Sequence, residues 1–422
     1  MTQRDGHRSP GRRTFLKIGG AAGVTALAGC TGGDGGGETD SGATTGETDS
    51  TPETIVIGSN HPLTGGLSYT GGRMDQAVQL AAMLKNEAGG ISSLGGAELE
   101  VISGDNEGAQ ELGAEVAQQL IDDGAHVLTG CYSSPVSTAA ARVAERAQVP
   151  FVISVSVANS ILQETQLNYV YRPQPSAAQM GIDHARLMPQ IAADGGIDVT
   201  TAGLYYIDIS FGQSIRDTLR EELPKNGVEV IAETPINFGE TADTQVTQLR
   251  DADPDVVIST TYNAETVELV RAMDAQNYAP PLLAGCSSAA FNDVGSIEQM
   301  GATADGSLAT NFALDPTDAR AAEVQSRFES EFGEAFDANV AMTYASVQAI
   351  IAGIEAAGSA DTDAINDALR SITVEDHIAA MPPMSFDDRG ENENALAPLF
   401  QVQGDNSYVV APEEYAARSP SF

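Results

Sequence analysis

The chain has 422 residues, 42% of them hydrophobic, which is enough for about two or three domains with buried cores. Its 59 acidic residues and 21 Lys and Arg give a formal net charge of −38. This excludes nucleic acid as a partner, because phosphate binding needs a basic surface. The acidic residues are spread along the chain and lysine is nearly absent, a composition typical of a halophile. Molar salt, with a Debye length of about 3 Å, would screen the self-repulsion.

The first thirty residues have the layout of an export signal. Basic residues come first, and the apolar and small residues of 18–29 follow, too few to span a bilayer. RRTFLK at 12–17 is similar to a twin-arginine export signal, and LAGC at 27–30 is similar to a lipobox. We therefore predict a signal peptide over 1–29 and lipidation of Cys30. An ordinary cleaved signal with a fortuitous cysteine is the alternative.

The segment 30–52 is rich in Gly, Ser, Thr, Asp and Glu, and after Cys30 it has no apolar side chain larger than that of Ala except Pro52. Such a segment cannot bury enough surface to fold, so we predict a flexible acidic tether. A lipid anchor, a tether and a folded body place the body on the extracellular face of the cell membrane. We expect no membrane-spanning segment in the body.

From residue 53 onward, short β-branched runs alternate with stretches of helical periodicity. In the first half we predict strands at 54–58, 99–103, 126–130 and 150–154, and helices at 74–88, 109–122 and 136–147. In the second half we predict strands at 203–207, 228–233, 255–260 and 281–285, and helices at 177–192, 211–225, 243–252 and 264–277. The pattern predicts an α/β fold with two Rossmann-like lobes, each with a parallel central sheet.

The last third of the chain predicts a return to the first lobe. Long helical stretches at 317–332 and 340–357 follow a strand-like run at 305–312, and we expect 384–392 and 399–403 to form a terminal hairpin region. The predicted lobes are 53–173 with 309–376 (lobe 1) and 174–308 with 377–412 (lobe 2). We place the hinge near the crossovers at 172–176, 308–314 and 374–383. A ligand is expected beyond the carboxyl ends of the strands, in the cleft between the lobes.

Several segments, in register, carry a family resemblance. They are IVIGSNHPLTGGLSYTGGRMDQAVQLA at 55–81, LTGCYSSPVSTAAARVAERAQVPFVISVSVANSILQ at 128–163, YIDISFGQSIRDTL at 206–219, TYNAETVELVRAMDAQN at 261–277 and MTYASVQAIIAGIEAAG at 342–358. Over about residues 54–410, the chain resembles the leucine/isoleucine/valine-binding family of ABC-transporter receptors, which has the type I periplasmic-binding-protein fold. The resemblance implies a monomeric substrate-binding protein, without cofactor, that delivers a branched-chain or related amino acid to an ABC permease with its ATPase.

Two polar loops of lobe 1 are candidate ligand contacts. Ser133 and Ser134 follow strand 126–130 and precede a helix, so their hydroxyls and backbone N–H groups suit a carboxylate, although plain N-capping would also explain them. Ser156, Ala158 and Asn159 follow strand 150–154. The resemblance implies that this loop contacts the ligand through side chain and backbone, and turn chemistry is the alternative.

In lobe 2, Asp208, Phe211, Tyr262 and Ser287 follow predicted strand ends. The resemblance implies that Phe211 closes over the ligand and that Tyr262 offers an aromatic ring with a hydroxyl. Tyr69, in the glycine-rich loop GGLSYTGG at 65–72, could contact the ligand side chain. Each aromatic could instead be a core residue.

One position departs from the family pattern. The resemblance implies an acid near Ser287 that pairs with the ligand's α-ammonium, but AGCSSAAF at 284–291 contains no carboxylate. A buried ammonium without an anion is costly. Either Asp208 supplies the charge, or the ligand is neutral, such as urea or a short amide.

Other function classes find little support in the sequence. An exported hydrolase would need a G-x-S-x-G elbow, and a dehydrogenase would need a G-x-G-x-x-G after a strand. The sequence has neither motif, so we predict no enzyme. A metal site needs more ligands than the scattered histidines and two distant cysteines supply. Cys131 and Cys286 could form a disulfide or remain two buried thiols. A ligand sensor without transport would need a signalling module, and no such module is evident.

Overall fold

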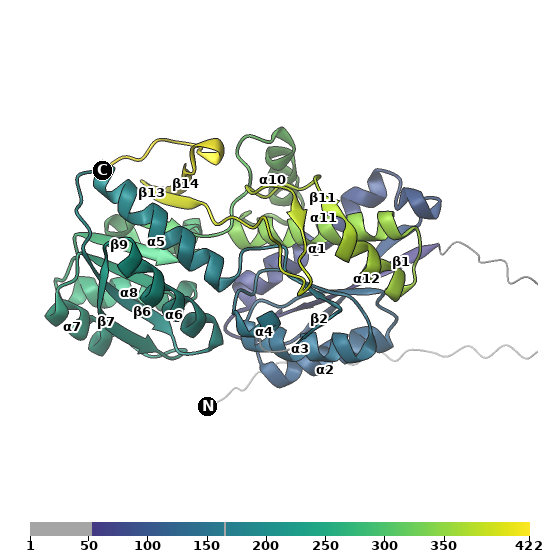
Figure 1. Ribbon diagram of the computed structural model, residues 1–422, viewed down its shortest axis with the longest axis horizontal. Coiled ribbons are helices and arrows are strands. Elements are labelled where there is room, and N and C mark those ends of the chain that lie inside the picture. Colours follow the sequence, from purple (N-terminus) through teal and green to yellow (C-terminus); the bar gives the residue numbers. More distant parts are fainter. Residues whose placement is uncertain (1–52, 164–165) are drawn as a thin grey trace, which may run out of the picture. The chain divides into compact units, whose positions relative to one another are not determined.

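The computed structural model describes residues 53–163 and 166–422 (Figure 1). These belong to one compact unit, Ser50–Phe422. The predicted signal peptide, the lipidation site Cys30 and the tether lie outside the described residues, so those assignments stay predictions.

The first sheet consists of parallel strands in the order β2-β1-β3-β4-β5. Its strands are β1 (Thr54–His61), β2 (Glu98–Asp105), β3 (Val127–Gly130), β4 (Phe151–Ile153) and β5 (Val170–Tyr171). The chain reaches each new strand through a helix, which is why the strands run parallel.

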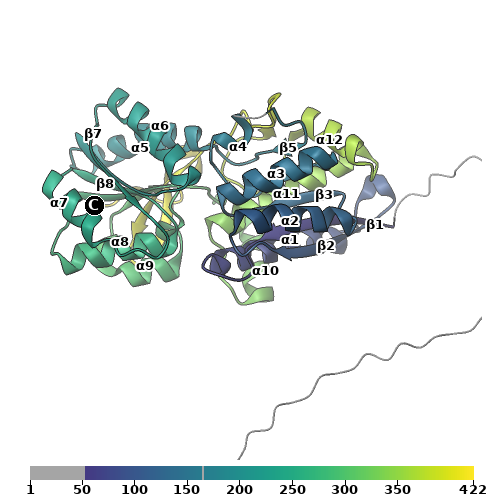
Figure 2. The same cartoon turned by 90° about the horizontal axis from the view of Figure 1, so that it is seen from below.

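Helices cover both faces of this sheet (Figure 2). Successive strand residues point to opposite faces: Val127 packs with one buried cluster and Leu128 with another. The first cluster contains side chains of α1 (Ser68–Glu87), α10 (Ala319–Phe332), α11 (Ala338–Ala357) and α12 (Thr362–Ser371). The second contains side chains of α2 (Gln110–Asp122), α3 (Ser134–Ala147) and the short α4 (Ser160–Gln163).

Helix α11 is long and apolar enough to cross a membrane by length and composition, but 67% of its apolar window is buried inside the protein. It packs against α1 and α12, so it is a core helix of the body.

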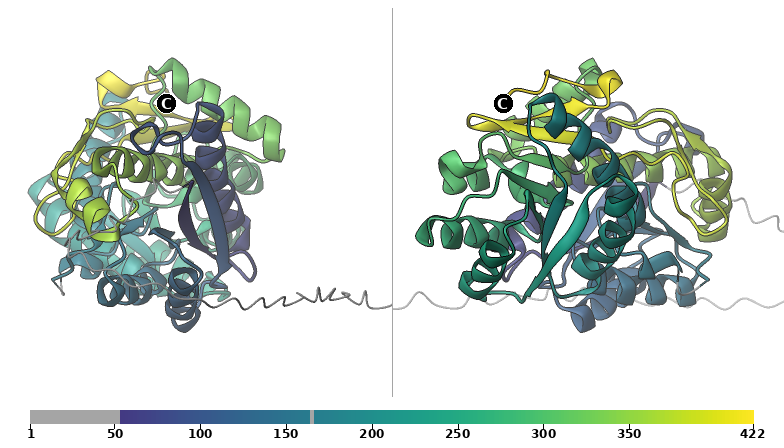
Figure 3. Two further views of the ribbon diagram at one scale, coloured as in Figure 1. Left: turned by 90° about the vertical axis from the view of Figure 1, so that its right-hand side faces the viewer. Right: turned by 60° about the vertical axis from the view of Figure 1, so that its left-hand side comes forward.

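The second sheet has the order β14-β13-β10-β9-β8-β6-β7, parallel except where β13 joins β10 and β14. Its strands are β6 (Thr201–Ile207), β7 (Glu229–Ile236), β8 (Val256–Thr260), β9 (Leu282–Cys286), β10 (Leu308–Thr310), β13 (Leu399–Gln403) and β14 (Asn406–Ala411). The hairpin of β13 and β14, yellow in Figure 3, forms one edge of this sheet.

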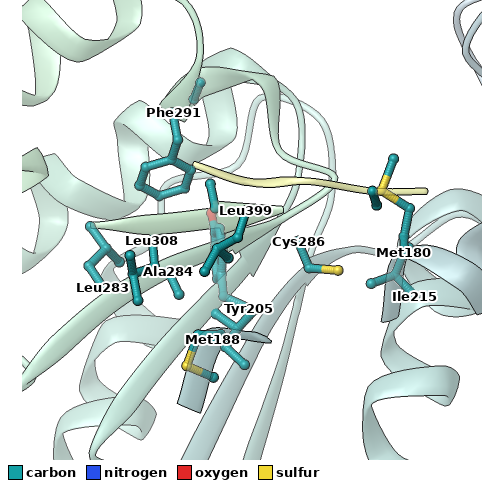
Figure 4. Close-up of a cluster of buried hydrophobic side chains, with 14 of the residues drawn as sticks. Met180, Met188, Tyr205, Ile215, Leu283, Ala284, Cys286, Phe291, Leu308 and Leu399 are labelled. Atoms are coloured by element: carbon teal, nitrogen blue, oxygen red, sulfur yellow. The ribbon is translucent and has the colours of Figure 1, made fainter. Parts of the chain in front are cut away.

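One face of the second sheet carries α5 (Ala177–Asp194) and α6 (Ser210–Lys225) (Figure 2). The other carries α7 (Asp243–Ala252), α8 (Asn263–Ala275) and α9 (Val294–Met300). Figure 4 shows part of the buried core of this sheet, with Met188 from α5, Tyr205 from β6, and Leu308 and Leu399 from the strands β10 and β13. Short 3₁₀ turns lie at Ser92–Leu94, Ala289–Phe291, Gly301–Ala304 and Glu413–Tyr415.

The α/β fold with parallel-dominated sheets is confirmed, and the predicted strands and helices up to residue 357 are present with small shifts at their ends. Helix α1 begins at Ser68, earlier than predicted, so Tyr69 lies on its first turn and not in a loop. The predicted terminal hairpin is wrong. β12 (Met384–Ser385) pairs with β11 (Thr373–Val374), while β13 pairs with β14. Helix α12 was not predicted.

The last crossover between the two sheets contributes to both cores. Ile378 and Phe386 belong to the buried cluster of the first sheet, whereas Met381 and Met384 belong to the cluster of the second. The proposed lobe boundary at 376/377 therefore stays a prediction.

Candidate functional site

The loops that follow β3 and β4 pack directly on each other. Ser156 Oγ lies 2.9 Å from the carbonyl oxygen of Cys131 and 2.6 Å from Ser137 Oγ. The N–H of Ala158 donates to Ser134 Oγ at 3.3 Å. Ser133 occupies the N-cap position of α3, but its hydroxyl makes no capping hydrogen bond. The predicted N-capping explanation for Ser133 therefore fails, and its hydroxyl is available to another partner.

A cavity of about 740 Å³ lies between elements of the two sheets. From the first-lobe side it is lined by Tyr69 and Thr70 of α1 and by Tyr132. From the second-lobe side it is lined by Tyr262, Glu265 of α8 and Asp293. Its size is within the usual range for small-molecule sites of about 300–1,000 Å³.

A second, much narrower space of about 20 Å³ adjoins this cavity. Five of the predicted site residues line it: Ser134, Ser156, Phe211, Tyr262 and Ser287. A volume of this size holds about one water molecule, so an amino acid needs the lobes to move apart here. The predicted residues thus converge from both lobes on a space that is closed in this structure.

Two tyrosines line both spaces and so separate them. The rings of Tyr132 and Tyr262 meet edge to face, with centroids 5.1 Å apart. Tyr262 also contacts Phe211 at 5.3 Å and stacks on Phe238 at 5.5 Å. Phe238 is half exposed. This aromatic wall offers an apolar surface to a ligand side chain.

Acidic side chains dominate the charge of the larger cavity. Of its described lining residues, Glu107, Glu265 and Asp293 are acids and Arg271 is a base. Glu265 is 6% exposed, and its Oε2 has no hydrogen-bond partner among the described residues. Burial raises the pKa of Glu265, although the backbone N–H groups of Glu265 and Gly239 counteract this. A cationic ligand group would relieve this buried carboxylate.

A buried ion cluster joins α1 to the second lobe beside the cavity. Arg73 Nη2 lies 2.7 Å from Asp337 Oδ2, and Nη1 lies 3.5 Å from Asp293 Oδ1. The hydroxyl of Tyr69 donates to the same Asp293 oxygen at 3.0 Å. Burial disfavours the charged form of Arg73, but Asp337, Tyr69 and Asp293 outweigh it and raise its pKa. Each acid also caps the N-terminus of a helix: Asp293 caps α9, and Asp337 caps α11.

Four predicted site residues line neither space. Ser133 is buried at the N-cap position of α3. Ala158 is buried behind Ser134, and Asn159 Oδ1 accepts from the N–H of Ala178 at 3.0 Å. Asp208 is exposed, and its carboxylate accepts from Gln213 Nε2 at 2.9 Å. The position of Asp208 does not favour it as the missing counter-charge.

Sequence reasoning missed the most informative residues of the cavity, namely Tyr132, Glu265 and Asp293. Tyr132 lies inside the quoted loop and directly precedes the predicted serines. Glu265 falls in the first turn of a helix, where an acid is ordinary helix chemistry. Asp293 comes six residues after the expected acid position, and only the fold brings it to the cavity.

Asp75, Ser59 and His61 form a buried hydrogen-bonded series with the residue types of a hydrolase triad. Ser59 Oγ donates to Asp75 Oδ1 at 2.5 Å and lies 2.9 Å from His61 Nδ1. Here the serine lies between the other two groups, whereas a catalytic triad needs the histidine there. Burial lowers the pKa of His61 to about 4, with Asp75 opposing it. Ser59 is fully buried and lines neither space, so we interpret this group of three side chains as structural.

No group of three or more His, Cys, Asp or Glu side chains within the described part of the chain is placed to hold a metal ion. Cys131 and Cys286 are free, buried thiols, which decides between the two alternatives for this pair. Cys286 ends β9 inside the core shown in Figure 4.

Known proteins are similar to this chain in sequence over most of its length. The family model for periplasmic binding proteins matches residues 54–407. Leu/Ile/Val-binding protein homolog 8 of Brucella abortus is 24% identical over 380 residues, covering 87% of this chain and 93% of the relative.

Two solved structures are similar in fold. The branched-chain amino acid transporter substrate binding protein LivJ from Streptococcus pneumoniae, in complex with isoleucine, has a TM-score of 0.72, with 20% identity, over 85% of this chain and 100% of that one. A solute binding protein of an ABC transporter from R. palustris, in complex with benzoate, has a TM-score of 0.73, with 18% identity, over 87% and 98%. Because the family model spans most of the two-lobed body, the chain belongs to the periplasmic binding protein family of solute-binding proteins.

Proposed function

We propose that this protein is the substrate-binding component of an ABC importer and that its ligand is a branched-chain or related amino acid held between the two lobes. The observation that carries the proposal is the cavity of about 740 Å³, which combines an aromatic wall with buried carboxylate charge. The aromatic wall suits an aliphatic side chain, and the carboxylates suit an α-ammonium.

The charge of the cavity separates the candidate ligands. An aromatic acid, such as the benzoate bound by the R. palustris protein, has no cationic group for Glu265. Urea and short amides are neutral and would leave the same carboxylate unpaired. An amino acid supplies the cation. Once the lobes move apart and open the narrow space, its carboxylate would lie beside Ser134 at the start of α3, where backbone N–H groups favour an anion.

We propose a role for each of the five predicted residues that line the narrow space. Ser134 and Ser156 would bind the ligand's carboxylate side, Phe211 and Tyr262 would close from the second lobe, and Ser287 would complete the polar wall. Glu265, in place of Asp208, would hold the ammonium. Closure would bring the two lobes onto the ligand, because contacts from both lobes favour the closed state.

The cellular setting follows from the N-terminal segment and the charge. We propose export by a twin-arginine-type signal, acylation of Cys30, and attachment to the outer face of the membrane through the tether 30–52. The permease would receive the solute there. The net charge of −38 supports a body exposed directly to high salt.

Calorimetric titration of the purified chain in molar KCl tests the ligand. We expect heat of binding with leucine, isoleucine or valine, and none with benzoate. Heat with urea or short amides, and none with any amino acid, would overturn the proposed ligand class. Mass spectrometry of the chain from membranes tests the anchor, since acylated Cys30 would be the new N-terminus.

A further inference from the structure

The first crossover between the lobes, residues 172–176, carries an arginine with no exposed surface. Arg172 directly follows β5, and its side chain is 0% exposed. Burying a guanidinium is costly unless its donors are paired. The hydrogen-bond and ion-pair partners of Arg172 therefore indicate its role.

Two of its donors bind the loop that follows β4. Arg172 Nη1 donates to the carbonyl of Val157 at 2.8 Å, and Nη2 donates to the carbonyl of Ala158 at 2.9 Å. A planar guanidinium presents two parallel donors in a fixed geometry, which matches two successive carbonyl groups. The remaining edge faces Glu391, with Nε 3.5 Å from Oε2.

Neighbours of Arg172 bind the same loop. Gln174 Nε2 donates to the carbonyl of Ser156 at 3.0 Å, and the N–H of Ala177 donates to the carbonyl of Val157 at 2.7 Å. The crossover and the first turn of α5 thus bind three consecutive carbonyls, those of Ser156, Val157 and Ala158. The loop is attached to the connection that leads into the second lobe.

The crossover itself is fixed by a second connecting segment, 390–392. The N–H of Arg172 donates to the carbonyl of Gly390 at 2.7 Å, and Asn392 Nδ2 donates to the carbonyl of Pro173 at 2.8 Å. Gly390 has φ +83°, and a Cβ there would lie 2.0 Å from the carbonyl oxygen of Val170. Only glycine permits this approach, so the two connecting segments lie in direct contact at Arg172.

The other side of the loop faces the predicted ligand residues. Ala158 donates its N–H to Ser134 Oγ, and Ser156 Oγ contacts the carbonyl of Cys131. The loop 156–158 therefore lies between the serines of α3 and the crossover.

We propose that Arg172 is a positioning residue, which fixes the loop 156–158 to the interlobe crossover and thereby sets the ligand-binding serines and the hinge in one arrangement. The inference rests on the proposed function, because it takes Ser134 and Ser156 as ligand contacts. Arg172 itself lines neither space, so its proposed effect on the ligand is exerted through the loop 156–158.

The experiment compares three full-length proteins: wild type, Glu391→Gln, and the double variant Arg172→Met with Glu391→Gln. The single variant is the matched control, because it removes the charge beside Arg172 and leaves both loop hydrogen bonds. The double variant removes those hydrogen bonds without leaving an unpaired carboxylate. Met fills similar space along the side chain.

Two measurements are made at a temperature where all three proteins are folded. The first is hydrogen–deuterium exchange of peptides covering 154–159 and, as an internal reference, the strand 54–61. The second is calorimetric affinity for L-leucine. Relative to Glu391→Gln, we expect about tenfold faster exchange in the loop, unchanged exchange in the reference strand, and about tenfold weaker leucine binding.

The outcomes separate this inference from the proposed function. Unchanged loop exchange in the double variant would overturn the positioning role. Faster exchange with unchanged leucine affinity would also overturn it, because the loop would then not set the binding residues. If wild type binds none of the branched-chain amino acids, the proposed ligand is wrong, and the exchange measurement alone still decides whether Arg172 holds the loop.

Discussion

The substitution Arg73→Met tests the buried ion cluster beside the cavity. Arg73, Asp293 and Asp337 have side chains only 2–3% exposed, and Arg73 is the base that both acids share. Removing the guanidinium leaves two buried carboxylates without a counter-charge. Breaking a buried ion pair in this way costs about 3–5 kcal/mol.

This loss of unfolding free energy converts into a decrease of the melting temperature. The compact unit Ser50–Phe422 has about 370 residues, and an unfolding entropy of about 2.1 cal/mol/K per residue gives about 0.8 kcal/mol/K in total. We therefore expect Arg73→Met to lower the melting temperature by about 4–6 °C. Scanning calorimetry of the ligand-free chain in molar KCl measures it.

Arg327→Met is the matched control. Arg327 pairs with Glu87 at 2.8 Å, but its side chain is 39% exposed, so its loss should cost under about 1 kcal/mol. The effect of Arg73→Met should also persist from low to high salt, because buried pairs are weakly screened. Asp337→Asn added to Arg73→Met should recover part of the loss, since Asn still caps α11. Equal melting temperatures of the Arg73→Met and Arg327→Met variants would refute the reasoning.

The other predictions concern ligand and pH. Glu265→Gln should weaken leucine binding about tenfold or more in calorimetry, whereas Glu268→Gln, which lies on the same helix but does not line the cavity, should not; equal affinities would exclude Glu265 as the ammonium partner. Ser134→Ala should weaken leucine binding in calorimetry, and unchanged affinity would remove Ser134 from the site. Burial alone would raise the pKa of Glu355, but hydrogen bonds from Lys85 and two backbone N–H groups outweigh it and lower the pKa to about 2. Because the folded-state pKa is lowered, this stabilisation is complete above the unfolded value of about 4.5 and is lost as pH falls towards 2. Glu355→Gln should therefore lower the melting temperature at neutral pH and have less effect near pH 2, and a pH-independent difference would contradict the assignment.

Local pattern was enough to predict most elements of the fold. The β-branched run at 54–58, the apolar and aromatic run at 203–207 and the helical periodicity at 243–252 correspond to β1, β6 and α7, because period and composition are set by neighbours along the chain. The pairing of the C-terminal strands was not predictable in this way. In the structure β13 pairs with β10 on one edge and with β14 on the other, while β12 pairs with β11, and local pattern does not distinguish these partners.

The candidate site was predictable where residues follow strand ends. Ser134, Ser156, Phe211, Tyr262 and Ser287 were chosen on that basis, and they line one space because the carboxyl ends of the strands in both sheets face it. Asp208 satisfied the same rule but points to solvent, where it binds Gln213. The end of a strand fixes the backbone position of the residue that follows it. The direction of that residue's side chain depends on tertiary packing.

The sequence by itself determined the α/β class, the resemblance to a solute receptor and the acidic surface, since these depend on composition and on short-range periodicity. The tertiary structure decided which charges meet. Arg73 and Asp293 are 220 residues apart, and Arg172 and Glu391 are 219 apart, yet the fold brings each pair together around a buried arginine. No local pattern distinguishes these residues from the other charges of a strongly acidic chain, because burial and pairing arise only when the two lobes are folded together.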